Sequence, residues 1–143
     1  MSPIAILKAA VIVTILTGLI SLGGAHPSTS TAWSLLFDIE RWPIDGADGA
    51  LSDEARLLSA VLGGVMAGWG VMMWRLVSGP IARGEAEARQ TLLIGTTVWF
   101  LLDSMGSMVS GWPANVALNM GFYPMFLFPL LALGRRRPTP VRK

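Results

Sequence analysis

The chain has 143 residues, of which 52% are apolar and 14% are charged, and its mean hydropathy is +0.57. Soluble domains carry roughly 25% charged residues, so this composition indicates a chain solvated mainly by lipid. Without cysteine there are no disulfides, thiolate metal sites or cysteine nucleophiles, and one histidine is too few for a histidine metal site. The net charge of +2 comes from residues at the ends of apolar segments. We therefore expect no catalytic site, cofactor, metal or nucleic-acid partner.

Charged residues divide the sequence into four apolar segments, each close to the roughly 20 residues that a helix needs to cross a bilayer. The predicted membrane helices span about residues 4–24, 55–77, 89–110 and 114–133. Short connections make the last three helices antiparallel neighbours, and prolines at 124 and 129 can kink the fourth. The sequence predicts one all-α membrane domain over 1–143, an antiparallel bundle of four transmembrane helices.

The first apolar segment fits two interpretations. Lys8 followed by an apolar run and by the small residues Gly23 and Ala25 is typical of a secretory signal with a cleavage site. The run is longer than the roughly 7–15 residues of a usual signal core, and apolar residues precede Lys8, which favours a retained helix. Cleavage would leave three helices instead of four.

Lysine and arginine gather on one side of the predicted bundle. Four crossings place nine of the eleven basic residues on one face, whereas the opposite face holds two basic and six acidic residues. Because cytoplasmic flanks retain lysine and arginine, we expect a bacterial inner-membrane protein whose two termini, including the basic tail 134–143, are cytoplasmic.

The periplasmic loop over residues 25–54 carries a helical signal of its own. Ser or Thr at positions 30 and 31 can cap a short amphipathic helix that runs through Ile39. We expect this helix to lie on the outer membrane surface, with Trp33 and Trp42 at headgroup depth and Pro43 ending it. The acidic residues that follow lack the spacing of a calcium loop, so we expect a solvated turn in which Ser52 caps the next helix.

The second predicted membrane helix is rich in small residues at four-residue spacing. Two adjacent stripes carry them, one formed by Ala60, Gly64 and Gly68 and the other by Ser59, Gly63 and Ala67. Gly64 and Gly68 make a GxxxG motif, a spacing that lets another helix approach closely. The stripe predicts helix packing within this chain or, as the alternative, contact with another membrane protein or a second copy.

Asp103 is the one charged residue inside the third predicted helix. An ionised carboxylate at that depth costs on the order of 3 kcal/mol or more unless it is paired, protonated or hydrated. Asp103 lies about 12 Å from the outer end of its helix at 1.5 Å per residue, a depth that the fourth helix reaches between Asn119 and Tyr123. Ser107 shares its stripe, and Asn115, Asn119 and Tyr123 share another. The spacing predicts that these two stripes face each other.

Two interpretations of this polar set remain open. Asp103 can be the titrating group of a proton pathway, an ion pathway or a ligand site, with Ser107, Asn115, Asn119 and Tyr123 around it. Alternatively, its carboxyl can hydrogen-bond to neighbouring amides and hydroxyls and simply hold the third and fourth helices together. No basic residue at matching depth offers Asp103 a counter-ion.

Three stretches, Leu51–Trp74, Trp99–Ser107 and Asn115–Asn119, resemble a family of small four-helix bacterial inner-membrane proteins without an assigned activity. The resemblance covers most of the chain from the first loop onward and implies four membrane helices, but no site, cofactor or partner. We therefore expect a non-catalytic accessory, assembly or scaffold component of a larger membrane system, in contact with lipids. The alternative is a small oligomeric transporter or proton-coupled channel centred on Asp103.

Overall fold

The computed structural model describes residues 1–42, 44 and 51–135, and these residues form helices and turns without a strand. The elements are α1 (Pro3–Gly23), α2 (Thr31–Arg41), α3 (Asp53–Leu76), the π-helical turn η1 (Val77–Ile81), α4 (Ala86–Val109), α5 (Pro113–Phe122) and α6 (Pro124–Gly134). Four helical segments are long and apolar enough to cross a membrane: Pro3–Gly23, Asp53–Ile81, Ala86–Val109 and Pro113–Gly134. The prediction of four apolar helices in an all-helical chain is thereby confirmed.

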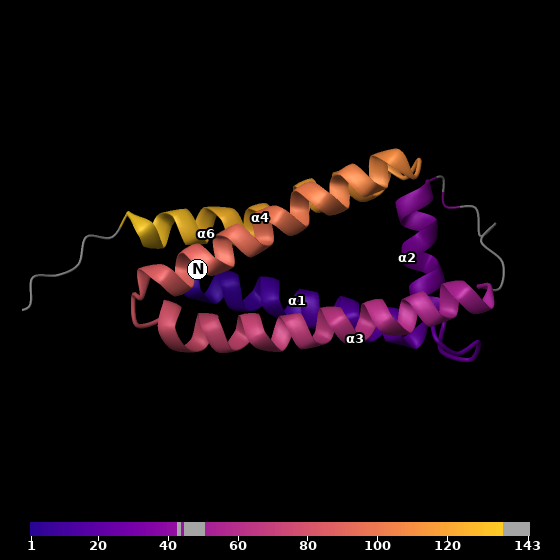
Figure 1. The fold of residues 1–143 in the computed structure, drawn as a ribbon, viewed down its shortest axis with the longest axis horizontal. Helices are drawn as coiled ribbons and strands as arrows, with labels where there is room; N and C mark the ends of the chain where they lie inside the picture. The colour runs from indigo at the N-terminus through magenta and orange to yellow at the C-terminus, as the bar shows by residue number, and fades with distance from the viewer. Residues whose placement is uncertain (43, 45–50, 136–143) are drawn as a thin grey trace, which may run out of the picture.

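The long helices form two groups that meet at one end of the molecule and diverge at the other (Figure 1). α1 and α3 pack along their length, while α4 lies with α5 and α6, and α6 also packs against α1. α2 crosses the open end, where it contacts both α1 and α5. This short helix therefore bridges the two groups at the end where they stand apart.

The apolar core lies at the end where the two groups meet. Each long helix contributes to it through one face; its members are Leu7, Ala10, Val11, Met73, Val77, Ile81, Leu92, Phe126 and Leu130. Basic side chains surround the same end. Lys8 lies 5.3 Å from the ring centre of Trp74, and the Arg89 guanidinium donates to the Leu130 carbonyl over 3.5 Å.

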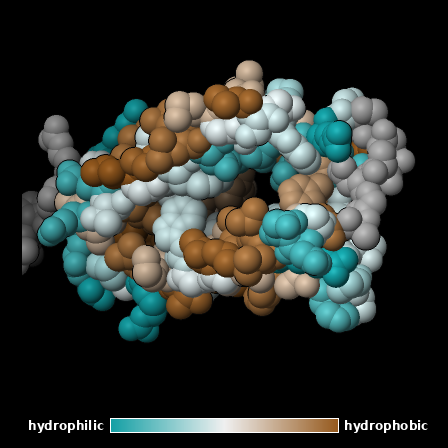
Figure 2. All heavy atoms as spheres, turned by 45° about the vertical axis from the view of Figure 1, so that its right-hand side comes forward, coloured by the Kyte–Doolittle hydropathy of each residue, from teal (hydrophilic) through white to brown (hydrophobic). Residues whose placement is uncertain are grey.

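Most of the remaining apolar surface is exposed. Large side chains in the middle of the helices, such as Leu16, Val65 and Leu101, are each about half exposed or more, at 52%, 64% and 58%. Hydrophobic side chains cover broad parts of the face drawn in Figure 2, and hydrophilic ones gather towards its ends. An apolar girdle between polar ends is the surface that a lipid-solvated helical protein presents.

Close packing of α1 on α3 depends on small residues, but not on the GxxxG stripe. A Cβ added at Gly63 would lie 2.5 Å from the Leu22 backbone nitrogen, and one added at Gly18 would lie 2.7 Å from the Ala67 nitrogen. By contrast, a Cβ at Gly64 or Gly68 would meet nothing within 4 Å. Within this chain the Ser59, Gly63 and Ala67 stripe therefore makes the contact, and the Gly64 and Gly68 face points away from the other helices.

α2 differs from its prediction in how it begins, and Trp33 makes a contact that the sequence did not indicate. Neither side chain at its start caps it, because the Ser30 hydroxyl donates to the Pro27 carbonyl instead. Trp33 is buried, with 5% of its surface exposed, and its indole N–H donates to the Ser59 hydroxyl over 2.7 Å. The Trp33 ring therefore anchors α2 to α3, and its place at headgroup depth stays a prediction.

The end of α2 and the beginning of α3 are set by nearby residues. α2 ends at Arg41, and Trp42 follows with a positive φ of 41° and 67% exposure. The Ser52 hydroxyl accepts from the Ala55 N–H and caps α3, as predicted. Pro43, the acidic turn at 45–50 and the tail 136–143 lie outside the described residues.

The fourth span is divided by proline. α5 ends at Phe122 and α6 begins at Pro124, with Tyr123 between them. Proline has no N–H to donate to the preceding turn, so the helical ladder is interrupted there. Pro129 lies inside α6 and is buried, without ending the helix.

Candidate polar site at the α4–α5 turn

A tight turn between α4 and α5 builds the site. α4 ends in a left-handed glycine, Gly111, with φ of 80°. The Trp112 N–H donates to the Ser107 carbonyl over 2.8 Å and the Gly111 N–H to the Met108 carbonyl over 3.2 Å, the two bonds of a Schellman motif. Pro113 then occupies the first turn of α5. This reversal places the last two turns of α4 against the first two of α5.

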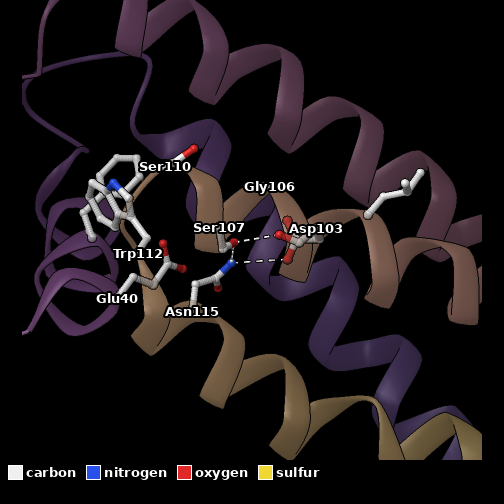
Figure 3. A pocket seen from close by; sticks show the side chains of 9 residues that line it. Glu40, Asp103, Gly106, Ser107, Ser110, Trp112 and Asn115 are labelled. Atoms are coloured by element: carbon white, nitrogen blue, oxygen red, sulfur yellow. Dashed lines mark hydrogen bonds between the residues drawn. The ribbon is translucent and has the colours of Figure 1, made fainter.

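Asp103 is held by two amides from the facing helix. Its Oδ2 accepts from Asn119 Nδ2 over 2.5 Å and from Asn115 Nδ2 over 3.2 Å. The Asn115 amide also donates to the Ser107 hydroxyl over 2.8 Å, and that hydroxyl donates to the Asp103 backbone carbonyl over 2.7 Å. Figure 3 shows Asp103, Ser107 and Asn115 facing one another. The structure thus brings together four of the predicted site residues.

Tyr123, the fifth predicted residue, takes other partners. Its hydroxyl lies 2.7 Å from the Thr97 hydroxyl, and its ring stacks on Phe100 with 4.6 Å between ring centres. The long tyrosine side chain carries its hydroxyl past the level of Asp103 towards the middle of α4. Tyr123 and Thr97 therefore form a second polar contact between the helices, separate from the hydrogen bonds of Asp103.

A pocket of about 360 Å³ lies beside these residues, between α2 and the α4–α5 turn. It is lined by Phe37, Glu40, Leu102, Asp103, Gly106, Ser107, Ser110, Trp112 and Asn115. Glu40 reaches the pocket from α2, and in Figure 3 its carboxyl lies on the side of Ser107 and Asn115. Phe37 and Trp112 meet edge to face with ring centres 5.8 Å apart. No sequence spacing connects Glu40 with Asp103, because α3 separates their helices in the chain.

Two acids, Glu40 and Asp103, set the electrostatics of the pocket. Burial raises the pKa of Glu40 from 4.5 to about 7, and the negative charge of Asp103 adds to the rise. Among the described residues that line the pocket, none is a lysine, arginine or histidine. No group of three or more histidine, cysteine or acidic side chains in the described part of the chain is placed to hold a metal ion.

The polar side chains between the helices, which run from Asp103 to Thr97 and Tyr123 and form a polar series, end where the apolar core begins. Beyond Thr97 and Tyr123, the space between the helices is occupied by core residues such as Leu92 and Phe126. Thr96, fully buried at this level, gives its hydroxyl hydrogen to the carbonyl of Leu92 in its own helix. In the described part of the chain, the polar groups thus reach from the α2 end to mid-length and no further.

No protein-family model, no curated protein and no solved structure matches this chain.

Proposed function

We propose that the chain is a non-catalytic accessory component of a larger membrane system, built as an antiparallel four-helix bundle in a bacterial inner membrane. In this arrangement the core end, with its basic side chains, faces the cytoplasm, and α2 lies at the outer surface. The observation that carries the proposal is the apolar core, because it ends the polar series at mid-length and leaves a single copy without a polar route across the bilayer.

The hydrogen bonds of Asp103 support the same conclusion. Two asparagine amides and the Ser107 hydroxyl satisfy the polar groups between α4 and α5, as expected of side chains that hold a helical hairpin together in lipid. Contact with a partner protein can then use the uncovered faces of the helices. The face of α3 that carries Gly64 and Gly68 suits a close helix contact, since a Cβ at either position would meet no described atom within 4 Å.

The test is a paired substitution on two uncovered glycines. Gly68→Leu fills the α3 face, and Gly95→Leu adds the same bulk to α4, where a Cβ would also meet nothing within 4 Å. Full-length tagged protein is purified from its own membranes in mild detergent. We expect a reproducible partner with the natural chain and with Gly95→Leu, and its loss with Gly68→Leu. A natural chain that purifies alone as a monomer would contradict the accessory role.

The second candidate is a small oligomeric transporter or proton-coupled channel centred on Asp103, and the neighbouring carboxyls of Asp103 and Glu40 favour it. Because a single copy has an apolar core, the pathway would have to form between copies. Reconstituted vesicles with a pH gradient test this candidate. Faster gradient decay that Asp103→Asn abolishes would support transport, and decay equal to that of empty vesicles would exclude it.

A further inference from the structure

We propose that the pocket between α2 and the α4–α5 turn binds an ammonium group, carried either by a small soluble amine or by the headgroup of an aminophospholipid. The inference goes beyond the accessory role and does not depend on it. It requires only that α2 and the α4–α5 turn lie together at one end of the helices, as they do in the structure.

The first argument is charge. Glu40 and Asp103 come from different helices and face the same pocket, with no basic side chain among its described lining residues. The asparagine amides donate to Asp103 but carry no charge, so no positive group among the described lining residues faces the two carboxyls. A proton on Glu40 removes the repulsion between the two acids, and this repulsion adds to the effect of burial in raising the pKa of Glu40. A bound cation would relieve the same repulsion and displace that proton.

The second argument is the chemistry of the walls. Magnesium and calcium require six or more oxygen ligands in a closed shell, whereas this pocket is lined by two carboxyls and two aromatic rings. Phe37 and Trp112 stand edge to face at its rim, and aromatic rings attract organic cations through their electron-rich faces. The hydroxyls of Ser107 and Ser110 add acceptors for N–H donors. A volume of about 360 Å³ suits a small organic group better than a bare ion.

The third argument is position. The pocket lies at the end of α4, beside a short helix that crosses the ends of the long ones (Figures 1 and 3). In a membrane, this end of the helices is at the level of lipid headgroups. An ammonium group can reach it there from the aqueous phase or from a neighbouring lipid, so the same chemistry has two sources.

The experiment titrates the purified full-length chain with ethanolamine at pH 7.5, in nanodiscs of phosphatidylglycerol, which contains no amine. Binding is followed by calorimetry, and ethylene glycol serves as the neutral analogue. Glu40→Gln and Asp103→Asn each remove one acid from the pocket, and Glu87→Gln removes an exposed acid at the beginning of α4 as the matched control. Helical content and gel-filtration behaviour of each variant show whether it is folded.

We expect saturable ethanolamine binding by the natural chain and by Glu87→Gln, at least tenfold weaker binding by Glu40→Gln and by Asp103→Asn, and no response to ethylene glycol. Proton release on binding should disappear in Glu40→Gln. The proposal is overturned if the natural chain shows no saturable binding, if ethylene glycol binds equally, or if folded Glu40→Gln binds as tightly as Glu87→Gln.

A second set of nanodiscs identifies the source of the ammonium group. If phosphatidylethanolamine in the bilayer weakens apparent ethanolamine binding at least tenfold, the headgroup occupies the pocket. If it leaves the binding unchanged, the pocket serves a soluble amine. Either result supports the ammonium site. The accessory role is tested separately by partner loss with Gly68→Leu, so absence of ethanolamine binding is distinguishable from failure of the accessory role.

Discussion

Removing the carboxyl of Glu40 should stabilise the protein at neutral and alkaline pH. The folded protein holds a proton on Glu40 up to about pH 7, whereas the unfolded chain releases it near 4.5. Between these values the folded state binds more protons than the unfolded state, so stability falls as pH rises and levels off above pH 7. At 1.4 kcal/mol for each factor of ten in acidity, the upper limit of this loss is about 3.5 kcal/mol. Glu40 is partly open to solvent, which reduces the expected loss to about 1–2 kcal/mol.

The measurement is thermal unfolding of the natural chain and of Glu40→Gln in the same detergent at pH 5 and pH 8. The two proteins should have similar Tm values at pH 5, and Glu40→Gln should be several degrees more stable at pH 8. Asp103→Asn should reduce the pH dependence only in part, because burial is the larger cause of the raised Glu40 pKa. Equal pH dependence in the natural chain and in Glu40→Gln would refute the reasoning.

Three further predictions concern packing and topology. Gly63→Ala should lower the Tm, because the added Cβ would lie 2.5 Å from the Leu22 backbone nitrogen. The Cβ added by Gly68→Ala would meet no described atom within 4 Å, so this variant should leave the Tm unchanged or raise it. Equal Tm values for the two variants would contradict the packing of α1 on α3. Trp33→Phe removes the 2.7 Å bond to Ser59 and should cost about 1 kcal/mol or more in denaturant unfolding, and an unchanged midpoint would show that this bond does not anchor α2. Reporter fusions at the two termini should both show a cytoplasmic location, and opposite locations would exclude an even number of crossings.

Features governed by local sequence could be predicted. Four apolar segments of membrane length were visible in hydropathy alone, and the Ser52 cap followed from residue type and position. The facing of Asp103 with Asn115 and Asn119 was also predictable, because a three-residue connection fixes how two helices return on each other. In this hairpin, four-residue spacing on both helices is enough to align the polar stripes.

Features set by distant contacts could not be predicted. Two small-residue stripes on α3 are nearly equivalent in composition, and the choice between them depends on Gly18 and Leu22 of α1, which approach Gly63. The approach of Glu40 to the pocket beside Asp103 depends on how α2 crosses the open end, where the Trp33 indole donates to the Ser59 hydroxyl. No spacing rule connects side chains on helices that are so far apart in the chain.

The divergence of the two helix groups gives the molecule a wedge shape, narrow at the core end and wide at the end spanned by α2 (Figure 1). Each copy in a bilayer would then displace more lipid area from one leaflet than from the other. The divergence of the two groups, and not helix tilt alone, makes these areas unequal, and the effect is additive when many copies share one patch. Membrane crowded with this protein should therefore bulge towards the α2 side, and curvature of that sign should in turn concentrate it.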